Sequence, residues 1–313
     1  MNQGITFYFE WEIRLMQWLQ RVLGELAAPI ASFFTMLGEE LILILILGFL
    51  YWCYDKEFGC FIGTNLVAGL CWNPMLKNVV LRRRPYFDNA VIKCLKVVNA
   101  EGDMFDTAVQ GFSFPSGHSM NSAIVYGSFP MYLKKRPAVI VAILVPLLVG
   151  VSRFILGVHY PTDVLVGWAM GLITLLVLSK IQEKIQNRWK LNLVIFLLSV
   201  PGVFYCRTMD YFTALGVMAG FFLAQEFEKR FVNFEMTRNP AYIVCRMLGG
   251  FIGYFGLNFI LKMPFNKEFL QADTTGSFLI RTLRYMIVTF VILGVYPIVF
   301  RLVEKNPERR SVC

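Results

Sequence analysis

Long apolar runs separated by short charged turns recur along the whole chain. The segment from Leu41 to Leu50 is almost entirely aliphatic, and the segment from Ala138 to Gly150 contains no charged residue. Of the 313 residues, 57% are hydrophobic and 16% are charged, whereas soluble domains have about 45–50% apolar and about 25% charged residues. Runs near 20 apolar residues are typical of membrane-spanning helices. The sequence therefore predicts an all-α, polytopic membrane helix bundle.

Helical spans are expected at ten places, which form a six-helix core followed by about four appended helices. An aromatic and charged segment at 5–24 is expected to be an interfacial helix at the start of the chain. The ten spans are expected near 22–37, 41–54, 59–81, 118–133, 138–157, 161–179, 191–206, 211–227, 242–261 and 283–303. We therefore divide the chain into the interfacial helix with the first span (1–37), the rest of the core (38–190) and a C-terminal four-helix membrane unit (191–313).

Basic residues cluster in the turns between spans, and this pattern sets the expected orientation. Although the formal net charge is +9, no basic face of a soluble domain is available, so nucleic-acid binding is not expected. Cytoplasmic loops carry an excess of Lys and Arg, as in Lys134–Arg136 and Lys180–Lys190. We therefore expect cytoplasmic termini and a location in the cell membrane, surrounded by membrane lipids.

Seven cysteines are scattered along the chain without a Cys-x-x-Cys pair. Most of them lie in expected spans, where cysteine ordinarily serves as apolar packing. A disulfide between Cys94 and Cys206 is the less favoured alternative, since both residues can face the same side of the membrane.

Three polar islands interrupt the apolar pattern of the core: Lys77–Pro85, Pro115–His118 and Ser152–Asp163. They contain both histidines of the chain, His118 and His159. The segment between the second and third islands is long enough for one span across the membrane and one back. The islands are therefore expected on one membrane face, which the charge pattern makes the outer face.

The third island carries a histidine and a carboxylate at a helical spacing. Asp163 follows His159 by four residues, which places both side chains on one helical face. A carboxylate bonded to one imidazole nitrogen fixes the tautomer and leaves the other nitrogen as an oriented base or nucleophile. A buried pair with a purely structural role is the alternative interpretation.

The second island begins an expected helix, and its first residues are Ser116 and Gly117. Free backbone N–H groups at a helix N-terminus bind anions, and a glycine lets the anion approach closely. Taken alone, the pattern is better described as a helix start capped by Ser116.

The first and third islands also carry cations. Lys77 and Arg84 are seven residues apart and share a face if the helix persists that far, although Pro85 tends to end a helix there. An ionised residue among apolar neighbours, such as Lys77, is functional by default. Arg153 also ends an apolar span, where it can extend toward the interface. Arg82 and Arg83 are expected to be interfacial anchors. Cations around a backbone anion site describe a phosphate site, and no metal or other cofactor is expected, because no cluster has metal-ligand spacing.

Three motifs summarise these islands: Lys77-x6-Arg84-Pro85, Pro115-Ser116-Gly117-His118 and Ser152-Arg153-x5-His159-x3-Asp163. Together they resemble the signature of the type 2 phosphatidic acid phosphatase superfamily, which includes integral-membrane lipid phosphate phosphatases and vanadium haloperoxidases. The resemblance covers about residues 38–180. It implies that His159 is the nucleophile that forms a phosphohistidine, that Asp163 orients it, and that His118 acts as general acid and then base. It also implies a phosphate site made of Lys77, Arg84, Ser116, Gly117 and Arg153, with Ser152 in support.

The expected function is hydrolysis of a lipid phosphate or pyrophosphate at the outer membrane face, without a metal. A lipid transporter or flippase that binds the phosphate without cleaving it is the alternative, and haloperoxidase chemistry is a third, less favoured one. The identity of the lipid, the pairing of two copies into a homodimer and the role of 191–313 stay open.

Overall fold

The computed structural model describes residues 4–100, 102–185 and 187–304, and nearly all of its regular structure is helical. Within these residues, the only extended pairing is an isolated parallel bridge between Ile5 and Arg82. Helices form at all ten places expected from the apolar runs. The predicted fold class, a membrane helix bundle, is confirmed.

The chain divides into two compact units. The first contains 1–43, 68–184 and 204–208, and the second contains 44–67, 185–203 and 209–313. Helices α3 (Glu40–Phe49) and α4 (Lys56–Val80) each contribute residues to both units. The division of the sequence at residues 37 and 190 stays a prediction about its organisation.

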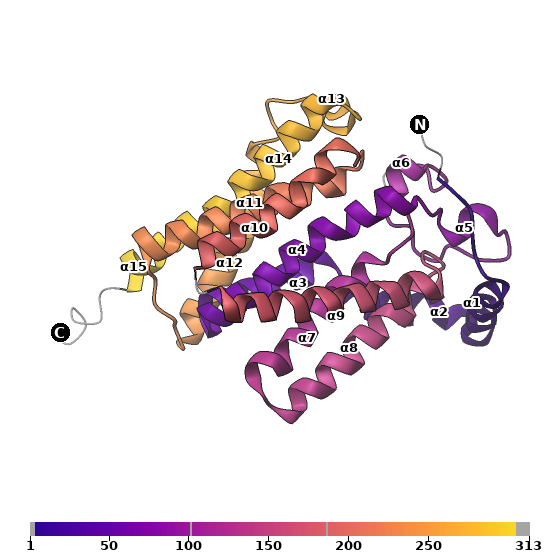
Figure 1. Cartoon of the computed structure of the whole chain (residues 1–313), viewed down its shortest axis with the longest axis horizontal. Helices are drawn as coiled ribbons and strands as arrows, with labels where there is room; N and C mark the ends of the chain where they lie inside the picture. Colours follow the sequence, from indigo (N-terminus) through magenta and orange to yellow (C-terminus); the bar gives the residue numbers. More distant parts are fainter. Residues whose placement is uncertain (1–3, 101, 186, 305–313) are drawn as a thin grey trace. The chain divides into compact units, whose positions relative to one another are not determined.

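The first unit is built around α7, which packs against α8 and α9, while α2 packs on α8 (Figure 1). Close approach of α9 to α7 depends on Gly167 and Gly171, as the small-residue spacing predicts. A Cβ atom added at Gly167 would lie 2.6 Å from the carbonyl oxygen of Ser116. The helices of this unit outside α3 and α4 are α1 (Glu10–Leu23), α2 (Ala27–Met36), α5 (Pro85–Asp88), α6 (Thr107–Gln110), α7 (Gly117–Leu133), α8 (Arg136–Ile155) and α9 (Pro161–Lys184).

The second unit is organised by α11, which lies along α14 (Figure 1). Gly216 and Gly220 permit this contact, because a Cβ atom at either position would collide with the α14 backbone at Thr282 or Met286. The helices that lie wholly in this unit are α10 (Arg188–Ser199), α11 (Met209–Phe227), α12 (Pro240–Ile260), α13 (Lys267–Gln271), α14 (Thr275–Phe290) and α15 (Ile298–Glu304).

Five helical segments of the described chain are long and apolar enough to cross a membrane, and they make the protein a multi-pass membrane protein. They are Glu10–Tyr54, Arg136–Ile155, Pro161–Lys184, Pro240–Ile260 and Thr275–Val303. The crossing of the membrane by all ten expected spans stays a prediction.

Within the described residues no cysteine forms a disulfide, and this includes Cys94 and Cys206. The alternative of a disulfide between them is therefore wrong. Cys206 is buried, in keeping with its interpretation as packing, whereas Cys245 is exposed. Cys313 lies outside the described residues.

Candidate active site

The first polar island begins in the last turn of α4 and continues as an extended segment after the helix ends. Leu81 has a positive φ of 56° and ends the helix, with its amide donating to the carbonyl of Lys77 at 2.8 Å. Pro85 then keeps Arg84 extended, with ψ at 153°, as expected for a residue before proline. The N-terminal segment pairs with this stretch, because the Ile5 amide donates to the Leu81 carbonyl at 2.8 Å. The island is thus held between the N-terminus and the rest of the unit.

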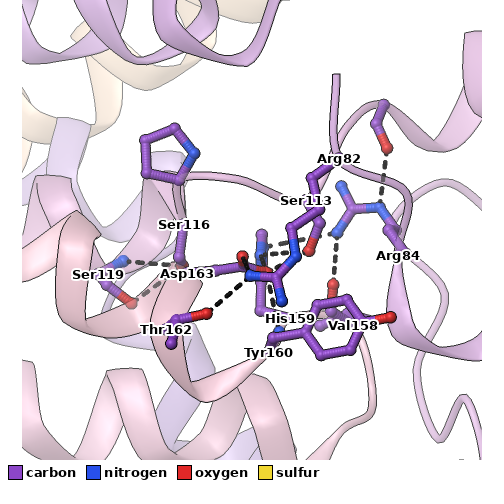
Figure 2. Close-up of polar contacts among 12 residues, drawn as sticks. Arg82, Arg84, Ser113, Ser116, Ser119, Val158, His159, Tyr160, Thr162 and Asp163 are labelled. Atoms are coloured by element: carbon purple, nitrogen blue, oxygen red, sulfur yellow. Dashed lines mark hydrogen bonds and ion pairs between the residues drawn. The ribbon is translucent and has the colours of Figure 1, made fainter. Parts of the chain in front are cut away.

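His159 and Asp163 meet at the junction of α8 and α9. The imidazole Nδ1 lies 3.4 Å from Asp163 Oδ2, and the two side chains are 2% and 0% exposed. The same carboxylate oxygen accepts from the Tyr160 amide at 2.8 Å and from the Ser113 hydroxyl. The expected contact between His159 and Asp163 is present (Figure 2), but His159 lies in the bend before α9, so the two side chains do not share a helical face.

Arg84 lies at the other edge of the His159 ring. Its Nη1 is 3.5 Å from His159 Nε2 and donates to the Val158 carbonyl at 2.9 Å. Its Nε and Nη2 donate to the Gln110 carbonyl at 2.9 and 2.6 Å. Because these carbonyls hold the guanidinium (Figure 2), it is fixed beside the nitrogen that Asp163 leaves free.

The N-terminus of α7 forms another side of the site and is hydrogen-bonded to α9. The Ser116 amide donates to the Asp163 carbonyl at 3.0 Å, and the Ser116 hydroxyl accepts from the Ser119 amide and hydroxyl at 3.4 and 2.9 Å. Ser116 is thus the N-cap, as the simpler interpretation of the second island holds. A Cβ atom at Gly117 would lie 3.2 Å from Asn73 Oδ1, so a glycine keeps this helix start close to α4.

Arg153 is buried in the last turn of α8, at 5% exposure. Its Nη1 donates to Thr35 Oγ1 of α2 at 2.7 Å, while its Nε has no partner among the described residues. The neighbouring Ser152 hydroxyl donates to the Val149 carbonyl of its own helix at 2.6 Å. Arg153 therefore has a spare donor in the site, whereas the Ser152 proton is used within α8.

The charges of the site act on His159, which lies between α8 and α9. Burial lowers the pKa of His159 well below its ordinary value, and the positive charges of Arg84, Arg153 and Lys77 lower it further. These charges and His159 also act on His118, in the first turn of α7. The cations of the first and third islands thus act on both imidazoles.

Arg82 is a member of this site that the sequence interpretation placed wrongly. It was expected to be an interfacial anchor, but its side chain is 0% exposed. Its Nη1 donates to Asp163 Oδ1 at 2.6 Å and its Nη2 to Glu12 Oε2 at 2.9 Å. The ring centroids of Phe7 and Tyr160 lie 4.4 and 3.9 Å from its guanidinium carbon.

Glu12 is the second buried group that sequence reasoning missed. It lies on α1 with 0% side-chain exposure, and its Oε1 accepts from the Thr162 amide and hydroxyl at 3.0 and 2.6 Å. Glu12, Arg82, Asp163 and His159 thus form one continuous chain of contacts (Figure 2 shows its last three members). The helix expected to rest on the membrane surface therefore supports the site.

A signal for Arg82 is present in the sequence. In an extended stretch, alternate side chains point to opposite sides, so Arg82 and Arg84 share a side and Arg83 points away. The structure agrees, because Arg82 and Arg84 are buried while Arg83 is 29% exposed and pairs with Asp88 at 3.2 Å. Ser113 and Gln110, in contrast, carry no such signal, because a long loop brings them to the site.

Comparison with known proteins finds two family descriptions that match this chain. Residues 58–187 match the family described as the PAP2 superfamily, a range that includes all three polar islands. Residues 212–308 match the description "PAP2 superfamily phosphatase, transmembrane extension". The comparison with solved structures found no match.

Two curated relatives are similar to parts of the chain. Phosphatidylglycerophosphatase B of Bacillus subtilis is 42% identical over 85 residues, which are 24% of this chain and 42% of that protein. Lipid A 1-phosphatase of Rhizobium etli is 33% identical over 134 residues, which are 41% of this chain and 53% of that protein. The chain thus spans about half the length of the curated relatives it matches.

Proposed function

Because the chain belongs to the PAP2 superfamily, whose phosphatases are hydrolases of lipid phosphates, we propose that it hydrolyses the head-group phosphate of a membrane lipid phosphate or pyrophosphate. The observation that carries this proposal is the environment of His159. One ring nitrogen faces a buried carboxylate and the other faces a fixed guanidinium. This arrangement suits a nucleophile that attacks a phosphoryl group, since the oriented nitrogen lies next to a cation able to bind the phosphate oxygens.

In the first step, His159 Nε2 attacks phosphorus and the bond from phosphorus to the lipid oxygen breaks. His118 donates a proton to that departing oxygen, and the products are a phosphohistidine and the free lipid alcohol or lipid phosphate. In the second step, neutral His118 takes a proton from water, the water oxygen attacks phosphorus, and the bond from nitrogen to phosphorus breaks. Inorganic phosphate leaves and both imidazoles return to their starting state. Two imidazoles can divide these roles near neutral pH.

Asp163 keeps the proton of His159 on Nδ1 and stabilises the positive ring that forms on attack. Arg82 holds the other oxygen of this carboxylate, and Glu12 holds Arg82. We assign Arg82 and Glu12 as positioning residues, since both act through Asp163.

Phosphate oxygens are assigned to Arg84, Lys77, Arg153 and the N-terminus of α7 at Gly117. Arg84 and Arg153 suit this role because a guanidinium binds phosphate with two parallel hydrogen bonds. Ser116 and Ser152 support the site mainly by ordering their helices. The reaction is proposed to need no metal, because these cations balance the phosphoryl charge.

The site is proposed to face the outer side of the membrane, with cytoplasmic termini and the cell membrane as its location. The support is the clustering of Lys134–Arg136 and Lys180–Lys190 in turns on the opposite side from the islands. A water-soluble lipid phosphate added to sealed, right-side-out vesicles should be hydrolysed at the same rate before and after permeabilisation. A rate that rises several-fold on permeabilisation would reverse this orientation.

The names of the relatives select the substrates to test first. Phosphatidylglycerophosphate and lipid A carry the phosphates named in them, and phosphatidate and undecaprenyl pyrophosphate complete the panel. With purified protein, phosphate release from the best lipid should fall by at least about 10³-fold in His159→Ala and in His118→Ala, because each removes an essential reacting group.

An acid-labile phosphoprotein trapped during turnover should disappear in His159→Ala. Full activity in this variant would overturn the mechanism. Vectorial lipid movement without phosphate release would support the transporter alternative instead.

A further inference from the structure

Two arginines lie one turn apart on α14 of the second unit, inside the segment Thr275–Val303 that is apolar enough to cross a membrane. Arg284 is 4% exposed and Arg281 is partly buried. Ser277 and Val288, which share this helical face, are buried too. The arginines therefore face the interior of the unit, where an ionised residue is costly and indicates a functional site by default.

Three nitrogens of these two guanidiniums lack an acceptor within the described residues. The Nε of Arg281 and the Nε and Nη1 of Arg284 are buried without a hydrogen-bond partner. Arg281 makes two long hydrogen bonds, each of 3.4 Å, to Thr213 Oγ1 and the Leu270 carbonyl, and Arg284 has the Tyr285 ring at 5.1 Å. Since buried polar groups are nearly always hydrogen-bonded, these donors indicate an acceptor that the described chain does not supply.

Charge leads to the same conclusion. The two guanidiniums act on each other as like charges, and the exposed Asp210 acts on Arg281 from a distance. Across the stretches that the structure describes, neither arginine forms an ion pair. Three other cations of the same unit do: Lys56 with Glu228, Arg188 with Glu57 and Arg230 with Glu226.

We propose that Arg281, Arg284 and the Thr213 hydroxyl form a phosphate-binding site of the second unit, which takes the phosphate of an anionic phospholipid or inorganic phosphate. An anion between the two guanidiniums would satisfy the spare donors and remove the like-charge repulsion. Guanidinium groups bind phosphate oxygens in pairs of parallel hydrogen bonds. Arg281, which is partly exposed and touches Leu270 at the end of α13, forms the open end of the site.

This proposal gives the C-terminal helices a function that does not depend on the histidine chemistry. The test uses the full chain in detergent and measures retention of phosphatidylglycerol by native mass spectrometry. The phosphate of this lipid is a diester, so it stays intact. Zwitterionic phosphatidylcholine is the lipid control, and inorganic phosphate is added in a separate arm.

Arg284→Gln and Arg281→Gln should each reduce phosphatidylglycerol retention at least about tenfold, while Arg238→Gln should leave it unchanged. Arg238 is the matched control because it is an exposed arginine of the same unit. If millimolar inorganic phosphate displaces phosphatidylglycerol, the free anion is itself a ligand of the site. If it does not displace the lipid, the lipid head group is the ligand. Equal retention of the lipid in all four proteins, or equal retention of phosphatidylcholine by the wild type, overturns the proposal.

If Arg284→Gln does not fold, Arg281→Gln decides alone, because this side chain is only partly buried. Phosphate release by the histidine site serves as the check that a variant is folded. Lipid retention is measured without turnover, so it does not depend on the proposed hydrolysis. A wild-type protein that is inactive but binds phosphatidylglycerol through Arg281 would contradict the proposed hydrolysis and still support the phosphate-binding site.

Discussion

Two buried arginines, one in each unit, stand in opposite electrostatic settings. Arg82 pairs with two buried carboxylates, Glu12 and Asp163, and two aromatic rings contact its guanidinium. Arg284 is about as buried but has neither a carboxylate nor an acceptor for two of its donors within the described residues. The difference teaches that burial of a cation alone does not indicate its role. A cation whose charge is paired with buried carboxylates holds the protein's own groups in place, whereas one without a carboxylate within the described residues is available to an anionic ligand.

The two settings also differ in what removal of the charge should do. Loss of one partner of a buried ion pair strands the other charge and typically costs about 3–5 kcal/mol. Loss of a buried charge that has no partner removes a desolvation penalty instead. Substitutions at these arginines therefore test the comparison directly.

The largest effect is expected from Arg82→Met. This change leaves Glu12 and Asp163 buried without their shared cation, so the free energy of unfolding should fall by about 3–5 kcal/mol. Phosphate release should fall by about 10²-fold or more, because Asp163 no longer holds His159 in one orientation. Thermal unfolding in detergent and kcat on the best lipid phosphate check the two effects.

Arg83→Met is the matched control, since Arg83 is the next residue and has one partly exposed ion pair with Asp88. Such a pair contributes about 0–1 kcal/mol, so both stability and kcat should stay close to wild type. A positioning role further requires that Arg82→Met change the pH profile of kcat, because a group that only stabilises the fold would leave it unmoved. Equal losses in the two variants would contradict the assigned role.

A second, smaller effect concerns the pH dependence set by Arg84. Burial and the charges of Arg84, Arg153 and Lys77 lower the pKa of His159, so the ring stays neutral and nucleophilic as the pH falls below about 6.5, the ordinary value. Activity should be lost only when the pH falls through the lowered pKa. Removal of one cation in Arg84→Gln should raise the pKa of His159 and move the acidic limb of kcat/KM to higher pH.

The measurement is kcat/KM against pH on a soluble lipid phosphate, with Arg83→Gln as the control for loss of a nearby charge. Arg84→Gln also removes a proposed phosphate ligand, so its rate should be lower at every pH. The position of the limb, rather than the rate, tests the electrostatic argument. A limb that stays in place or moves to lower pH would contradict it.

Much of the fold and part of the site follow from the sequence, because they depend on local patterns. Apolar run length located the helices, and the short separation of His159 and Asp163 indicated their contact, although the bend before α9 rather than a shared helical face brings them together. The setting of Arg82 depends on partners that are distant in the sequence, Glu12 and Phe7, which arrive only when the N-terminal segment pairs with the extended residues after Leu81. The three consecutive arginines look alike in composition. Their different burial comes from the alternation of an extended backbone.

The lack of acceptors for several donors of Arg281 and Arg284 within the described residues likewise could not be predicted from the sequence. Both residues lie in a segment with the spacing of an ordinary amphipathic helix. Asp210 on α11 would have been a reasonable ion-pair partner for either arginine. In the structure Asp210 is exposed and forms no ion pair with the α14 arginines within the described residues. Partner choice depends on how α11 and α14 pack through Gly216 and Gly220, and sequence spacing does not fix that register.

The smallest effect, and the one of opposite sign, is expected from Arg284→Met. In detergent free of anionic lipid, the variant should unfold at the same temperature as the wild type or a higher one, since a methionine fills the space without a charge to desolvate. Added phosphatidylglycerol should raise the unfolding temperature of the wild type, because a ligand that binds only the folded state stabilises that state. At a lipid concentration of 100 Kd the free energy of unfolding should rise by about 2.7 kcal/mol. The variant should gain little, so the order of stability should reverse on lipid addition. A large loss of stability in lipid-free Arg284→Met would instead mean that Arg284, like Arg82, is held by the protein itself, and the contrast between the two units would fail.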